Sequence, residues 1–159
     1  MSREASKTRA VREPNFSGTY LAGRVIDIGC GPDLCVPHAE AFDLEHGDAG
    51  KIVEFRPKNT YDAVHSSHCL EHMRDVSGAI SQWWSLIRVG GYLILIVPDE
   101  DLYEQGIWPS LFNADHKASF RAKGAKSWAP VSIDSVSLVR TLPGADICSV
   151  KAQDAHYDT

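Results

Sequence analysis

Residues 24–33 read RVIDIGCGPD, and this stretch decides the fold. Three β-branched residues, Val25, Ile26 and Ile28, form a short apolar run that stops abruptly at Gly29. Such a run followed by Gly-x-Gly indicates a buried strand that leads into a tight turn. Two glycines separated by one residue allow another backbone, or a ligand, to approach the main chain closely. The stretch therefore predicts a core strand with a candidate binding turn at its carboxyl end.

A second strand and a helix are predicted further along the chain. Residues 61–67, YDAVHSS, form a strand candidate that runs into a segment with apolar residues at helical spacing. These apolar residues are Val76, Ile80, Trp83 and Ile87. Asp75 or Ser77 would cap the helix at its start, and the glycine pair at 90–91 would end it. The spacing therefore predicts an amphipathic helix between two strands.

Residues 92–99, YLILIVPD, are almost continuously apolar. Such a run is typical of a strand that is buried on both faces, as in a parallel sheet. The order strand, helix, strand forms a right-handed crossover unit. The sequence therefore predicts an α/β fold with a mostly parallel sheet.

Polar residues gather where the predicted strands end. The three ends carry residues 27–31, residues 65–68 and residues 98–101, which supply glycines, hydroxyls, imidazoles and carboxylates. In open α/β sheets, ligands bind beyond the carboxyl ends of the strands. We therefore expect the functional site at this edge.

Length and composition narrow the class of protein. The chain has 159 residues, 43% of them hydrophobic and 23% charged, with a net charge of −5. This predicts a single domain over residues 1–159, with residues 1–23 as an N-terminal arm. The negative charge argues against a nucleic-acid partner, and the lack of a long apolar run argues against a membrane partner. The polar start and the scattered cysteines predict a cytoplasmic protein with reduced thiols.

Four motifs in order resemble those of one enzyme family. They are VIDIGCGPD at 25–33, FDLEHGDA at 42–49, YDAVHSSHCLEH at 61–72 and RVGGYLILIVPDE at 88–100. Together they resemble class I S-adenosylmethionine-dependent methyltransferases, most closely the small type 11 branch. The resemblance implies a Rossmann-like open sheet with helices on both faces. It also implies S-adenosylmethionine as cofactor and transfer of a methyl group to an oxygen or nitrogen of a small-molecule or sugar-type acceptor.

The resemblance also implies site residues. Backbone around Gly29, Cys30 and Gly31 would approach the methionine part of the cofactor, with Asp27 acting near its amino group. Asp43 would accept from the ribose hydroxyls, with Glu45 as the alternative. Further contacts to adenine and to the methionine end are expected from Asp48, Ala49 and Ser67, with His68 as the alternative to Ser67.

The chain departs from the family pattern in two places. Asp27 and Asp43 are only sixteen positions apart, and prolines interrupt the interval, so a full helix does not fit there. Near the carboxyl end, one helix around residues 132–142 and one strand around residues 146–151 are predicted, where the family has two closing strands. The sheet is therefore expected to be truncated relative to the usual seven strands, and a homodimer would cover an unpaired edge.

Two histidines are the candidates for acid–base chemistry. The loop at residues 99–120 is a predicted substrate loop, and it contains His116, the first candidate for a general base. His68 is the second candidate. A catalytically silent S-adenosylmethionine-binding protein remains an alternative function.

The stretch HCLEH at residues 68–72 has the spacing of the inverted zinc-protease signature. We interpret it instead as a junction between a strand and a helix, so that His68 and His72 do not share a helical face. No metal is then expected. A zinc hydrolase remains the less favoured alternative.

Overall fold

The structure is a computed structural model that describes residues 4–122 and 127–154. The described chain forms two compact units. The first comprises residues up to 70 together with 75–96, and the second comprises residues 71–74 together with those from 97 onward. Within the described ranges, each helix is too short or too polar to cross a lipid bilayer.

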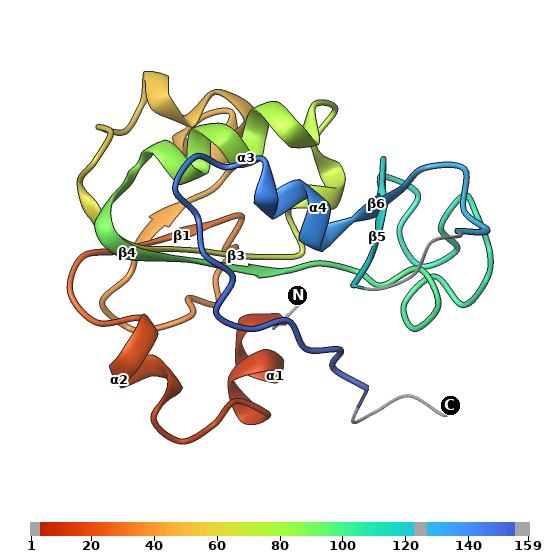
Figure 1. Cartoon of the computed structure of the whole chain (residues 1–159), viewed down its shortest axis with the longest axis horizontal. Helices are drawn as coiled ribbons and strands as arrows, with labels where there is room; N and C mark the ends of the chain where they lie inside the picture. The colour runs from red at the N-terminus through yellow and green to blue at the C-terminus, as the bar shows by residue number, and fades with distance from the viewer. Residues whose placement is uncertain (1–3, 123–126, 155–159) are drawn as a thin grey trace. The chain divides into compact units, whose positions relative to one another are not determined.

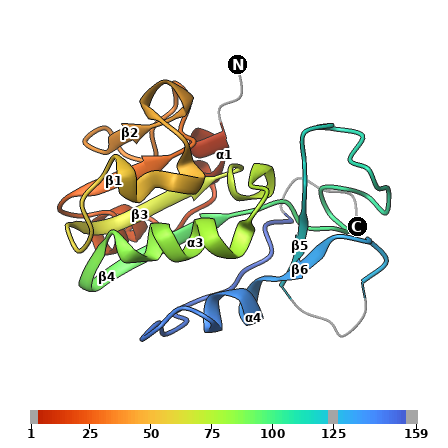
Figure 2. The same cartoon turned by 90° about the horizontal axis from the view of Figure 1, so that it is seen from above.

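The first unit is built on a four-stranded parallel sheet. Its strands are β1 (Val25–Ile28), β2 (Glu40–Phe42), β3 (Tyr61–Ser67) and β4 (Ile87–Ile96). They lie in the order β2-β1-β3-β4 (Figure 2). The prediction of a truncated, parallel α/β sheet is confirmed.

Helices cover both faces of this sheet, as predicted. Helices α1 (Glu4–Ala10) and α2 (Phe16–Tyr20) lie on one face, and α3 (Val76–Ser85) lies on the other (Figures 1 and 2). Ala5 and Leu21 belong to one apolar cluster with residues of the sheet, including Val25 and Ala63. The segment expected to be an arm therefore contributes part of the core.

Helix α3 begins where the sequence predicts and ends earlier. The Asp75 carboxylate caps its start and accepts a hydrogen bond from Gly78 N at 2.8 Å. The expectation that the glycine pair at 90–91 ends the helix is wrong, because Ile87 already pairs with Tyr61 in the sheet. The register shifts between Tyr61 and Ala63, so the glycine pair falls where β4 departs from regular pairing.

Short 3-10 turns follow two strands of the sheet. Turns η1 (Leu44–His46) and η2 (Ala49–Glu54) follow β2, and η3 (Leu70–His72) follows β3. The Trp83 indole donates to the carbonyl of Ala49 at 2.8 Å and so holds η2 to α3. The loop from residue 29 to residue 39 contains no helix, as the prolines predict.

The second unit contains a separate, two-stranded sheet. Strands β5 (Ser119–Arg121) and β6 (Ser132–Asp134) pair in parallel, and α4 (Ser135–Arg140) follows. The predicted helix over residues 132–142 is therefore shorter than expected. The strand expected over residues 146–151 is not formed, and this segment is exposed, so its β-branched residues have no sheet to join.

Candidate functional site

The two glycines of the first turn have different environments. Gly29 has φ +71°, and a Cβ there would lie 2.5 Å from the Cβ of Cys69. Gly31 has φ +52°, and a Cβ there would meet nothing within 4 Å. Gly29 is therefore required by the close approach of the loop after β3, whereas Gly31 borders open space that a side chain would fill.

Asp27 anchors the loop that follows β1. Its side chain is buried, and Oδ2 accepts a hydrogen bond from Cys35 N at 2.6 Å. Its Oδ1 lies 2.7 Å from His65 Nδ1. The Arg12 guanidinium lies 2.8 Å from His65 Nε2 and can only donate, so Nε2 accepts and the ring proton is on Nδ1. Both carboxylate oxygens of Asp27 are thus engaged inside the protein.

Asp27, Cys35 and His65 offer ligand atoms within 4.8 Å of one another, yet they form a closed hydrogen-bonded set. Both nitrogens of His65 are occupied by Arg12 and Asp27. Burial, and then the charge of Asp27, strongly raise the pKa of the Cys35 thiol. A protonated thiol is a poor metal ligand, so this set does not favour a metal.

The acidic residues expected to bind the nucleoside lie at the end of β2. Asp43 is half-buried, and its Oδ2 accepts from Gly31 N at 2.6 Å while Oδ1 accepts from Leu44 N at 2.7 Å. A carboxylate has about four acceptor positions, so Asp43 keeps further capacity. Asp48 is exposed and accepts from Gly50 N at 2.8 Å. Glu45 is also exposed, whereas Asp43 contacts the glycine turn directly.

Besides Arg56 Nε, which forms an ion pair with Glu40, two buried polar atoms of the first unit make no hydrogen bond within the described chain. They are Arg12 Nη1 and Ser67 Oγ. Ser67 ends β3, and Arg12 reaches the residue that pairs with Asp27. Together with the open space at Gly31, these donors fit a ligand that carries a carboxylate. The residues present therefore fit the carboxylate at the methionine end of S-adenosylmethionine.

Cys30 lies between the two glycines and is half-buried. Burial, and then the negative charge of Asp27, raise the pKa of its thiol to about 11. Cys30 is therefore a neutral thiol near pH 7 and is poorly suited to act as a nucleophile. Its expected contact with the cofactor is through the backbone.

The HCLEH stretch is a junction, as predicted. Strand β3 ends at Ser67, and His68 has φ +54° and donates its backbone N–H to Ile96 O at 3.0 Å. His72 lies in turn η3, and α3 starts only at Val76. No helix in the described ranges carries both histidines, so the inverted zinc-protease arrangement is not formed.

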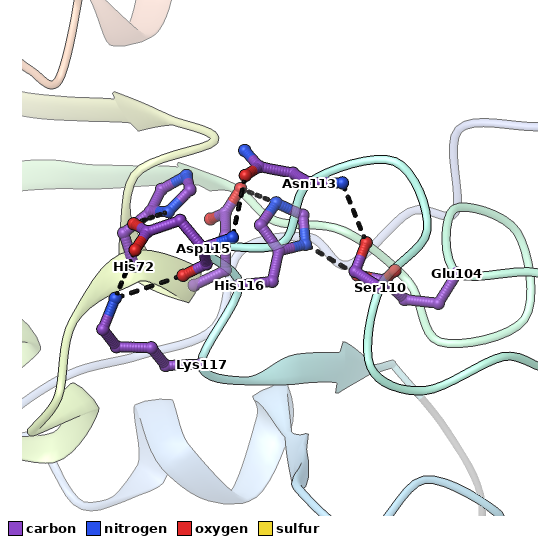
Figure 3. Close-up of polar contacts among 8 residues, drawn as sticks. His72, Glu104, Ser110, Asn113, Asp115, His116 and Lys117 are labelled. Carbon is purple, nitrogen blue, oxygen red and sulfur yellow. Dashed lines mark hydrogen bonds and ion pairs between the residues drawn. The ribbon is translucent and has the colours of Figure 1, made fainter.

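The loop of the second unit holds His116 between carboxylates. The side chain of His116 is 1% exposed, and Nδ1 lies 2.7 Å from Glu104 Oε1. Its Nε2 lies 3.8 Å from Glu71 Oε1. The nearby His72 Nδ1 lies 2.9 Å from Asp115 Oδ2, and Figure 3 shows His72 and His116 in the same cluster. The His116 side chain is therefore buried, and the carboxylates of Glu104 and Glu71 fix its orientation.

The sequence of the chain matches a known family. Residues 5–130, more than half of the chain, match the profile of a family described as "Methyltransferase domain". The chain belongs to this methyltransferase family. The match confirms the resemblance to class I S-adenosylmethionine-dependent methyltransferases, together with the enzyme class and the cofactor that the resemblance implied.

Two individual proteins resemble this methyltransferase. A "Ubiquinone biosynthesis O-methyltransferase" of Mesorhizobium japonicum is 20% identical over 98% of this chain and 72% of its own length. A crystal structure of a SAM-dependent methyltransferase from Archaeoglobus fulgidus has a TM-score of 0.55 and 22% identity. That alignment covers 73% of this chain and 62% of the solved chain, and it supports the fold.

In each unit, the sequence does not predict some of the residues that lie beside the candidate site residues. Arg12 lies in a segment without periodicity, and nothing local shows that it reaches His65. Leu44, 90% exposed beside Asp43, could have been noticed as an apolar residue in an acidic stretch. Glu71 stands inside the HCLEH motif, but its proximity to Glu104 and His116 depends on a long loop.

Proposed function

We propose that this methyltransferase transfers a methyl group from S-adenosylmethionine to an oxygen or nitrogen of a small-molecule acceptor, with an oxygen as the first choice. Three findings support this proposal: the family match over residues 5–130, the O-methyltransferase named among the relatives, and the turn at the end of β1. The observation that carries it is the open space at Gly31 beside the half-buried carboxylate of Asp43.

Different residues of the first unit would bind different parts of S-adenosylmethionine. Arg12 Nη1 and Ser67 Oγ supply donors to a carboxylate, and the residues after β2 supply acceptors to hydroxyls and to an exocyclic amine. Leu44 offers an exposed apolar side chain for a flat ring. These assignments place the methionine end near β3 and the nucleoside near β2.

Methyl transfer needs alignment more than it needs strong acid or base. The cofactor supplies a sulfonium-bound methyl group with a good leaving group when bound. The chain then has to hold an acceptor in line at near-contact distance and exclude water. An acceptor hydroxyl also has to lose its proton, and a histidine suits that step near neutral pH.

His68 is the more accessible of the two histidines considered for this proton. It is half-buried and follows Ser67 directly at the end of β3. The His116 side chain is 1% exposed, and its Nδ1 is engaged by Glu104. We therefore assign the proton-accepting role to His68 and not to the first choice from the sequence.

Calorimetry on two glycine variants tests the cofactor site. Gly31→Val should abolish binding of S-adenosylmethionine and of S-adenosylhomocysteine, because its side chain would enter the open space. Gly144→Val is the matched control, since Gly144 also has positive φ (+69°) with nothing within 4 Å. Unchanged binding in Gly31→Val would contradict the site.

Turnover on a panel of phenolic and amine acceptors tests the activity. Methylation of at least one acceptor supports the proposal. Cofactor binding without turnover on any of them would favour the catalytically silent alternative.

A further inference from the structure

The loop at residues 99–120 and the η3 turn bring two histidines and a glutamate together in the second unit. Glu71, His72 and His116 each offer one ligand atom, and these atoms lie within 4.8 Å of one another. The backbone explains this proximity, because Lys117 N and Ala118 N donate to the carbonyl of Glu71 at 2.8 and 3.3 Å. Two segments more than forty residues apart in sequence are thus fixed next to each other.

In this cluster, Nδ1 of each histidine lies within hydrogen-bond distance of a carboxylate oxygen. Glu104 Oε1 lies 2.7 Å from His116 Nδ1, and Asp115 Oδ2 lies 2.9 Å from His72 Nδ1 (Figure 3). Metal-binding histidines are typically held in this way, because the carboxylate fixes the ring and its tautomer. The arrangement leaves Nε2 of each ring as the ligand atom, and His116 Nε2 already faces Glu71 Oε1 at 3.8 Å.

We propose that Glu71, His72 and His116 bind one divalent d-block cation such as Zn²⁺. Ligand atoms about 2.1 Å from a tetrahedral zinc lie about 3.4 Å apart, so small side-chain rotations close the observed spacing. Two imidazoles and one carboxylate are a donor set that suits zinc and its neighbours better than Mg²⁺ or Ca²⁺. The proposal replaces the expectation from the sequence that no metal is bound.

The charge of the cluster also favours a cation. The side chains of Glu71 and Glu104 are 0% exposed, and Glu104 Oε2 makes no hydrogen bond within the described chain. Lys117 directs its ammonium to Asp115, with Nζ 2.9 Å from Oδ1, and not to these buried carboxylates. Two buried carboxylates therefore lie beside one imidazole, and a divalent ion next to Glu71 would offset part of this negative charge.

Three protein ligands leave a coordination position open. Binding of the metal itself does not depend on methyl transfer and is measured on the protein alone.

Calorimetry with ZnCl₂ on full-length protein stripped with EDTA tests the proposal. We expect one equivalent of Zn²⁺ with Kd at about 1 μM or below, and visible absorption bands when Co²⁺ replaces it. Glu71→Gln and His72→Ala should each weaken binding by at least about tenfold, and Asp115→Asn by about tenfold, because it loosens His72. Asp115 is largely exposed, so that variant is expected to fold even where Glu71→Gln does not.

His38→Ala is the matched control, since His38 is exposed and belongs to the first unit. It should leave zinc binding unchanged. The absence of stoichiometric zinc, or zinc binding that His72→Ala and Asp115→Asn leave intact, would overturn the proposal. Equal competition by Mg²⁺ would also overturn it. S-adenosylmethionine binding measured in the same samples separates this failure from a failure of the proposed function.

Discussion

His65 Nδ1 lies 2.7 Å from Asp27 Oδ1, and both side chains are buried. The pair joins β1 to β3, and the other oxygen of Asp27 holds the backbone of Cys35. Asp27, the acidic residue of the first motif, therefore stabilises the loop that contains the glycine turn. Its part in cofactor binding is proposed to act through the loop that it anchors.

Asp27→Ala should lower the free energy of unfolding by about 3 kcal/mol, because it leaves a buried imidazole without its partner. Urea denaturation measures the change. Asp33→Ala is the control: Asp33 accepts from Ser6 at a half-buried position, and its loss should cost about 1 kcal/mol. If Asp27→Ala kept full stability and lost only cofactor affinity, direct contact with the cofactor would be the better assignment.

Substituting alanine for each of the two turn glycines should change different properties of the protein, stability in one case and cofactor affinity in the other. Gly29→Ala places a Cβ against Cys69 at positive φ, so it should destabilise the protein by about 2–4 kcal/mol. Gly31→Ala should cost only about 1–2 kcal/mol for its backbone conformation, because nothing lies within 4 Å. It should nevertheless weaken S-adenosylmethionine binding. Thermal unfolding and calorimetry on both variants measure this, and equal losses of stability would contradict the distinction.

The sequence predicts the first unit well because its signals are local. An apolar run that stops at Gly29 gives β1, and Asp75 before an apolar stripe gives the start of α3. The end of α3 is missed because Ile87 suits a helix by spacing and a strand by its branched side chain. Pairing with Tyr61, distant in sequence, decides in favour of the strand.

The second unit is predicted poorly because its contacts are non-local. The apolar residues around Ile147 have the composition of a strand, yet they are exposed and pair with no other strand. The sequence predicts His116 as a general base, and the structure holds it buried with Nδ1 2.7 Å from Glu104 Oε1. Its carboxylate partners could not be predicted, since Glu71 and Glu104 approach it through backbone hydrogen bonds of an irregular loop.

Arg12 is expected to hold the carboxylate of the cofactor through Nη1, which is buried and unpartnered in the described chain. Arg12→Lys should weaken S-adenosylmethionine binding by about 10–100-fold, since a hydrogen bond to a charged group is lost. Methylthioadenosine lacks the amino-acid part, so its affinity should change little. Calorimetry with both ligands separates the two effects, and an equal loss for both would assign Arg12 a purely structural role.

His68→Ala should lower turnover about a hundredfold or more on a hydroxyl acceptor, the usual effect of removing a general base. The affinity for S-adenosylmethionine should stay nearly constant. His116→Ala should instead reduce zinc binding, since His116 is one of the three proposed ligands. Steady-state rates, with metal content measured in the same samples, distinguish these roles. Unchanged turnover in His68→Ala would remove it from the mechanism.

Cys30 provides a chemical probe of the bound state. Burial and Asp27 raise the pKa of its thiol to about 11 from 9.0, so the neutral form is favoured across the interval between these values. Its alkylation by iodoacetamide should therefore be slow at pH 8 and should keep accelerating up to about pH 11, because the thiolate is the reacting species.

S-adenosylmethionine should slow this alkylation of Cys30, since the cofactor is proposed to cover the turn between Gly29 and Gly31. Cys148, exposed and in the second unit, is the internal control, and its alkylation should not depend on the cofactor. Peptide mass spectrometry reports both rates from one sample, and equal rates at Cys30 with and without saturating cofactor would place the ligand elsewhere.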